Sequence, residues 1–264
     1  MIKNIIKAFL FKENIDDKKV IDNIDIKENI IDKPLDNVAK FNNIIDFACE
    51  VIYKTEIWKR EYPTLCTYSK DHPITDVIRL LGRKFQSEYF TNALEQRTDS
   101  ELPDIDLDTI FFDYTVELTN DGKKFLDIIE KKDIDKIVYL NKDIILPWPW
   151  HRGRLANNIA SIGEGRVNGK WKQDNNHRVY LYLPIGVSFV GGGNHSLTTG
   201  IIQGDGIVKP NGIYDITTVY KYVKCDGMNY IRIEDEQIIS PVYNIEFAAI
   251  FEIGRMMIEK GISF

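Results

Sequence analysis

Apolar residues recur at helical spacing through the first half of the chain. Between residues 38 and 60 they fall every three or four positions, which predicts an amphipathic helix with one polar face. The same spacing predicts a second helix from about residue 73 to residue 94, for which Asp71 or Thr75 is the expected cap. A shorter helix is expected at residues 125–131. The first half is therefore expected to be mainly helical.

Three segments of the first half lack this regular spacing. Residues 1–11 mix basic and apolar side chains and are expected to form a short amphipathic helix that packs on its own protein. Residues 12–36 alternate Ile with polar residues, which predicts a mobile arm, and the acidic residues 99–108 predict a loop. The expected divisions are the helix and arm at 1–36, a mainly helical region at 37–135 and a mixed α/β domain at 136–264.

The pattern changes after about residue 136, where β-branched and aromatic runs alternate with Gly, Pro and Asn turns. Strands are expected at residues 137–140, 143–146, 179–183, 186–190, 213–223 and 230–233. Helices are expected at residues 155–162 and 245–260, and Asp226-Gly227 is the expected turn before the last strand. These elements predict an α+β protein, with a helical N-terminal half and a mixed sheet in the C-terminal half.

Composition places the chain among ordinary globular proteins. Of its 264 residues, 44% are hydrophobic and 28% are charged, which is unlike a disordered chain. The net charge of -6 gives no general attraction to nucleic acid or to anionic membranes. The segment from His151 to Arg178 is locally basic, so it is either a solvated loop or a surface for a polyanion.

The cysteines and the N-terminus bear on location. The three cysteines, Cys49, Cys66 and Cys225, form no CxxC pair, which fits a reducing compartment. Residues 1–11 resemble neither a signal peptide nor a membrane span, because lysines interrupt the apolar run. We therefore expect a cytoplasmic protein without a membrane span.

The turn Gly191 to Ser196, after the expected strand at 186–190, is the most distinctive short segment. Glycines at a strand end let backbone amides approach a ligand, and a helix that begins there points its free N–H groups at an anion. The turn is therefore a candidate phosphate site, with a plain connecting turn as the alternative.

Each residue near the turn has an expected role at such a site. His195 is the expected acid, base or phosphate-orienting group. Arg152 and Arg154 would neutralise charge from across the cleft, and Arg178 is a further candidate cation. The remaining phosphate- or nucleotide-binding candidates are Gly192, Gly193, Asn194, Ser196 and Thr198.

Two familiar phosphate motifs do not fit the turn. A Walker A loop needs Lys and then Ser or Thr after its last glycine, where this chain has Asn194 and His195. Calcineurin-like phosphatases carry a Gly-Asn-His turn followed by an acid, but Ser196 stands in the place of that acid. The upstream Asp-x-His and Gly-Asp-x-x-Asp of that family are also missing before Gly193.

The order of motifs around the turn resembles ParB-like and sulfiredoxin-like domains. Those domains have a strand ending in proline, an arginine, a helix of the type Leu-Ala-x-Ser-Ile, and a strand that ends in a Gly-rich turn with His or Arg. The matching segments, over about 55 residues, are Ile144-Ile145-Leu146-Pro147, Arg152, Leu155-Ala156-Asn157-Asn158-Ile159 and Phe189 to Ser196. The second half also resembles an uncharacterised bacterial family with a Gly-Asn-His-Ser signature.

The ParB/sulfiredoxin resemblance implies a pocket for ATP or CTP with Mg²⁺, and an NTPase, phosphotransferase or nuclease activity in a bacterial or phage accessory system of the defence type. Asn194 replaces the sulfiredoxin cysteine, which argues against sulfinic acid reduction. Ser196 replaces the arginine that grips phosphate in most ParB-like members, so Arg152, Arg154 or Arg178 would have to substitute for it.

Other interpretations stay open beside this one. A metal site is an alternative use of His151, His177 and His195 with Asp174 or Asp205, although no metal is predicted. Two roles are open for Trp148, Trp150 and Trp171: they could stack on nucleic-acid bases, or they could pack over the core. The competing function is a non-enzymatic subunit that binds protein or nucleic acid, in which the glycine turn is purely structural.

Overall fold

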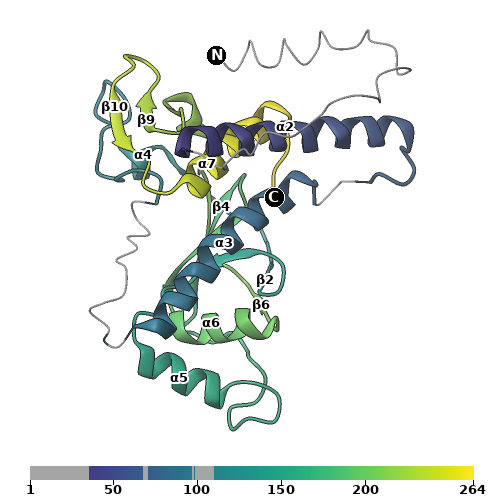
Figure 1. The fold of residues 1–264 in the computed structure, drawn as a ribbon, viewed down its shortest axis with the longest axis vertical. Helices are drawn as coiled ribbons and strands as arrows, with labels where there is room; N and C mark the ends of the chain where they lie inside the picture. The colour runs from purple at the N-terminus through teal and green to yellow at the C-terminus, as the bar shows by residue number, and fades with distance from the viewer. Residues whose placement is uncertain (1–35, 68–70, 97, 99–109) are drawn as a thin grey trace, which may run out of the picture. The chain divides into compact units, whose positions relative to one another are not determined.

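The computed structural model describes residues 36–67, 71–96, 98 and 110–264. The expected N-terminal helix, the arm up to residue 35 and the acidic loop at 99–108 lie outside these residues. The described residues belong to one compact unit, Leu35–Phe264, and are drawn in colour in Figure 1. It contains both helices and mixed sheets, so the α+β class is confirmed.

The two long helices of the first half form as their apolar spacing predicts. Helix α2 spans Asn37–Glu61 and begins where the Asp36 carboxylate accepts a hydrogen bond from the Ala39 amide at 2.7 Å. Helix α3 spans Ile74–Glu95. The expected caps Asp71 and Thr75 are wrong, because the N-cap residue is Pro73 and the Ile74 amide donates to His72 Nδ1 at 3.1 Å. Asp71 instead accepts from the Thr75 hydroxyl.

A five-stranded mixed sheet forms the centre of the second half, in the order β1-β7-β4-β5-β3. Its strands are β1 (Glu130–Lys132), β3 (Ile144–Leu146), β4 (Arg178–Leu183), β5 (Val187–Gly192) and β7 (Gly212–Asp215). Strand β5 runs antiparallel to β4 and parallel to β3, while β7 runs parallel to β4 and antiparallel to β1. The predicted mixed sheet is therefore present.

Two smaller sheets and the remaining helices complete the described chain. Strands β2 (Val138–Tyr139) and β6 (Ile207–Val208) pair with each other, and β8 (Val223–Cys225), β9 (Asn229–Arg232) and β10 (Ile238–Pro241) form an antiparallel sheet. The helices are α4 (Phe125–Ile128), α5 (Arg152–Ser161), α6 (Asn194–Gln203), the 3₁₀ helix η3 (Thr217–Lys221) and α7 (Ile245–Glu259).

Two expected elements are wrong in the same way, because a long-range pairing decides the local structure. The helix expected at 125–131 stops after α4, and β1 follows because its residues pair with β7. The strand expected at 213–223 is interrupted by η3, so that β7 joins the large sheet and β8 joins β9. These strand pairings cannot be predicted from the local spacing of apolar residues.

The large sheet is covered on both faces. On one face, Leu197 of α6 and Trp171 of the loop before β4 share a core cluster with Val179 and Leu181 of β4, and α5 lies beside α6 (Figure 1). On the other face, α3 and α7 share a core with β3 and β5, and α2 packs against α7. Residues from both sides of the expected division at residue 136 therefore contribute to one core.

Candidate phosphate site

The glycine turn connects β5 to α6 and is shaped by close packing. Gly193 has a φ of 79°, a left-handed conformation that glycine adopts without strain. A Cβ atom at Gly193 would stand 2.4 Å from the His177 ring, and one at Gly192 would stand 2.7 Å from the Asn176 carbonyl oxygen. The turn therefore needs glycine at both positions, to pass over the segment that precedes β4.

Helix α5 begins directly opposite this turn. His151 is its N-cap, and the His151 Nδ1 atom accepts from the Arg154 amide at 3.2 Å. The His195 Nε2 atom, in the first turn of α6, accepts from the His151 amide at 3.0 Å. The Asn194 side-chain oxygen accepts from the Trp148 amide at 2.7 Å. These two hydrogen bonds fix the starts of α5 and α6 side by side.

A cavity of about 600 Å³ lies between the two helix starts. Its described lining residues are Trp150, His151, Gly153, Arg154, Asn157, Asn158, Asn176, Gly191, Gly192, Gly193, Asn194, His195 and Ser196. Each helix contributes partial positive charge at its N-terminus, where the first backbone N–H groups lack partners within the helix. Gly193, as the N-cap of α6, has no side chain to cap those groups. The cavity therefore combines two helix dipoles with the Arg154 side chain.

Most residues predicted for the site line this cavity, namely Gly192, Gly193, Asn194, His195, Ser196 and Arg154. The Arg154 guanidinium lies 5.1 Å from the centroid of the Trp150 ring, which orients it by a cation–π contact. The Ser196 hydroxyl accepts from Trp171 Nε1 at 3.0 Å.

Three predicted residues are not among the lining residues. Arg152 points to the end of α3, where its Nη1 atom donates to the Gln96 carbonyl at 2.7 Å. The Arg178 Nη2 atom donates to the Gly191 carbonyl at 2.9 Å. Thr198 is fully buried, and its hydroxyl donates to the Asn194 carbonyl at 2.8 Å. Of the three arginines considered, Arg154 is thus the one at the cavity.

Sequence reasoning did not assign Asn157, Asn176 or Trp150 to the site. The signal for Asn157 was available, because it follows Arg154 by three positions on α5 and so lies on the same helical face. Asn176 reaches the cavity through the fold of the loop before β4, which no local pattern specifies.

The histidines near the turn do not gather as metal ligands. His177 Nδ1 accepts from the Asp174 amide at 2.8 Å, and burial lowers the pKa of its imidazole below the ordinary value. The His151 and His195 rings meet edge to face, with centroids 6.5 Å apart. In the part of the chain that the structure describes, no three His, Cys, Asp or Glu side chains are grouped to hold a metal ion.

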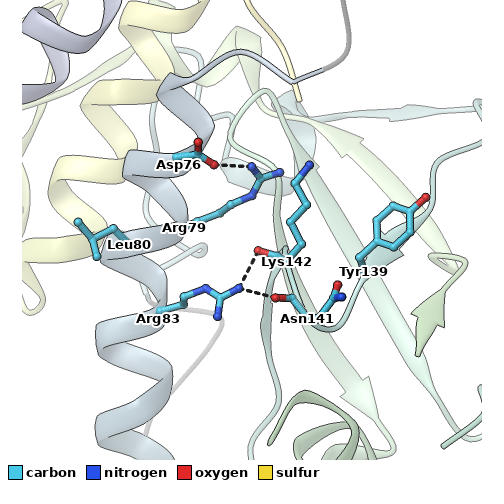
Figure 2. Close-up of a pocket in the computed structure, with 7 residues that line it drawn as sticks. All are labelled: Asp76, Arg79, Leu80, Arg83, Tyr139, Asn141 and Lys142. Atoms are coloured by element: carbon cyan, nitrogen blue, oxygen red, sulfur yellow. Dashed lines mark hydrogen bonds and ion pairs between the residues drawn. The ribbon is translucent and has the colours of Figure 1, made fainter. Parts of the chain in front are cut away.

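A second cavity, of about 700 Å³, lies where α3 meets the turn between β2 and β3, and Figure 2 shows its charged lining. Arg79 contacts Asp76 at 2.7 Å and Asp143 at 3.0 Å. Arg83 Nη2 donates to the carbonyl oxygens of Asn141 at 2.6 Å and of Lys142 at 3.2 Å, and Lys142 pairs with Asp71. Because each of these cations already binds protein oxygens, we interpret this cluster as a clamp between elements.

Comparison with known proteins identifies a family and no function. The model of the Family of unknown function (DUF6710) matches residues 7–264, so the chain belongs to that family. No curated protein matches the chain, and no solved structure matches it. Among the helices of the described residues, none is long and apolar enough to cross a membrane.

Proposed function

We propose that this member of the DUF6710 family binds the phosphate groups of a nucleotide, or of another phosphate compound, in the cavity between the starts of α5 and α6. The observation that carries the proposal is that two helix N-termini, a glycine turn and one arginine line the same cavity. Anions bind at helix N-termini because unpaired N–H groups and the helix dipole both favour negative charge.

The proposed roles follow from where each group lies. The amides that follow Gly192 and Gly193 would donate to phosphate oxygens, with further hydrogen bonds from Asn194 and Ser196. Arg154 would supply the positive charge that Ser196 cannot, from α5 rather than from α6. In ParB-like domains the phosphate-binding arginine follows the histidine. In this proposal, Arg154 of α5 takes the role of that arginine.

His195 is the proposed reactive or orienting group if phosphate is hydrolysed or transferred. It lines the cavity, and its Nε2 atom is held by the His151 amide. Nε2 therefore acts as an acceptor and the ring proton lies on Nδ1. The ParB/sulfiredoxin resemblance makes ATP and CTP, each with Mg²⁺, the first ligands to test.

The experiment compares two arginines that are two residues apart. Isothermal titration with ATP, CTP and GTP, with and without Mg²⁺, measures the dissociation constants of the wild type, Arg154→Gln and Arg152→Gln. Loss of a charge-assisted hydrogen bond predicts about ten- to 100-fold weaker binding for Arg154→Gln. Arg152→Gln is the matched control and should bind as the wild type does, because Arg152 contacts α3.

The competing hypothesis is a non-enzymatic subunit that binds protein or nucleic acid. It predicts no binding of any nucleotide in the same titration, with or without Mg²⁺. The basic segment that would contact nucleic acid is largely occupied by internal contacts, made by Arg152, Arg166, Lys170 and Arg178. The titration therefore separates the two functions directly.

A further inference from the structure

An aromatic cleft of about 520 Å³ lies next to the glycine turn, on the face of β4 and β5 opposite to α6. Its described lining is dominated by aromatic side chains from three parts of the chain, which are Phe112, Tyr114, Trp148, Tyr180, Tyr182 and Phe189. Its volume is in the range of small-molecule pockets. The cleft therefore offers an apolar, ring-lined space beside a polar, positively charged one.

Gly191 lies between the two cavities, because it lines both of them. Gly191 is the extra residue of a β-bulge, because Val179 pairs with Val190 and Arg178 pairs with Gly192. A Cβ atom at Gly191 would stand 3.0 Å from the Tyr180 ring. Glycine at this position lets the Tyr180 ring lie against the backbone where the two cavities adjoin.

A nucleotide matches this pair of cavities, since it joins charged phosphates to a flat aromatic base. Rings in the cleft meet edge to face, as Tyr182 and Phe189 do with centroids 5.2 Å apart and planes at 89°. A base could stack on the half-buried rings of this cleft in the way that aromatic side chains bind bases in single-stranded nucleic acid. An inorganic phosphate or a sugar phosphate would leave the cleft unused.

We propose that the ligand of the glycine turn is a nucleotide whose base lies in the aromatic cleft, reached past Gly191. This inference rests on the proposed phosphate function, and it specifies the ligand class for the same site. It assigns Tyr180, Phe189 and Trp148 to the base and leaves the phosphates to α5 and α6.

The first test is a titration of the full chain with ATP, CTP, GTP and UTP, and with tripolyphosphate, under identical salt and Mg²⁺ conditions. Stacking of a base predicts that at least one nucleotide binds roughly five- to 150-fold tighter than tripolyphosphate. If tripolyphosphate binds as tightly as every nucleotide, the inference is wrong and the phosphate site stands. If no phosphate compound binds, the proposed function itself is wrong.

Variants locate the base. Tyr180→Leu removes a ring that lines the cleft and not the phosphate cavity, so it should lower nucleotide affinity and leave tripolyphosphate affinity unchanged. Gly191→Val adds a side chain against the Tyr180 ring and should lower nucleotide affinity more than tripolyphosphate affinity. Tyr243→Leu, at an exposed tyrosine outside the cleft, is the control. A nucleotide preference that survives in Tyr180→Leu, with folding verified by circular dichroism, would overturn the inference.

Discussion

His177 shows at the scale of one residue how the turn is supported. It is almost fully buried beside Trp171, and the ring centroids are 5.0 Å apart. Its Nδ1 atom lies 2.8 Å from the Asp174 amide nitrogen and 3.0 Å from an oxygen of the Asp174 carboxylate. Nε2 has no hydrogen-bond partner within the described residues. A buried polar atom without a hydrogen bond costs roughly 1–3 kcal/mol, and the turn nevertheless places this ring directly against Gly193.

The burial of His177 predicts a pH dependence of stability. Burial holds its pKa below the ordinary value of 6.5, so between these two pKa values the unfolded chain binds more protons than the folded chain. The free energy of unfolding should therefore be at its full value above pH 6.5 and decline as the pH falls towards the folded pKa. Burial also lowers the pKa of His72, which adds a decline of the same sign.

His177→Asn tests this dependence, because the asparagine oxygen can still accept from the Asp174 amide and does not titrate. Urea denaturation at pH 7.5 and pH 5.0 should show a smaller loss of stability for this variant than for the wild type. His72→Asn, which removes the other shifted histidine, should reduce the loss independently. An unchanged loss in His177→Asn would show that the folded chain tolerates a protonated His177.

At the scale of elements, the Arg79 network joins α3 to the turn before β3. Asp143 is 4% exposed, and its two carboxylate oxygens accept from Arg79 at 3.0 Å and from the Tyr139 amide at 2.8 Å. Removing one partner of a buried ion pair leaves an uncompensated charge, which costs about 3–5 kcal/mol. We therefore expect Arg79→Met to lower the free energy of unfolding by about that amount.

Arg83→Met is the matched control for this clamp, since Arg83 is exposed and donates to two backbone carbonyl groups instead of pairing with a carboxylate among the described residues. Its cost should be about 1 kcal/mol or less. Combining Arg79→Met with Asp143→Asn removes both charges, so the double variant should be more stable than Arg79→Met alone. Chemical denaturation measures all three, and equal losses for Arg79→Met and Arg83→Met would contradict the clamp.

The same scale shows how far the sequence determines the fold. Helices α2, α3 and α7 and strands β4 and β5 follow from their own periodicity, because each has an apolar face set by local spacing. Strand β1 could not be predicted in this way, because its pairing with β7 joins residues far apart in the sequence. At the site, the turn was located from its strand and glycines.

The sequence alone does not show which of two arginines faces the cavity. Both Arg152 and Arg154 precede the apolar residues of α5, so the sequence pattern does not distinguish the directions of their side chains. The helix turns them about 200° apart, since two residues advance 100° each. Arg154 then faces the cavity, and Arg152 faces the end of α3. Which of the two faces the cavity depends on how α5 packs against α6.

At the scale of the whole molecule, one core unites sequence regions that differ in secondary structure. Ile52 of α2 and Ile78 of α3 are buried in the same cluster as Ile144, Val187 and the apolar face of α7. A chain that began at residue 136 would expose that face of the sheet and of α7 to water. Burial of a single large aliphatic side chain contributes about 1.5–3 kcal/mol, so the loss of several such contacts exceeds the stability of a typical domain.

We therefore predict that the fragment 136–264 does not fold cooperatively, even though it contains every residue lining the proposed phosphate cavity. Its amide proton NMR spectrum should lack dispersion, and its circular dichroism signal should change gradually with temperature. Adding a fragment of residues 36–135 in excess should restore a cooperative transition if α2 and α3 supply the missing core. A sharp transition in fragment 136–264 alone would mean that the sheet and α7 are stable without these helices, and that residue 136 marks a true domain boundary.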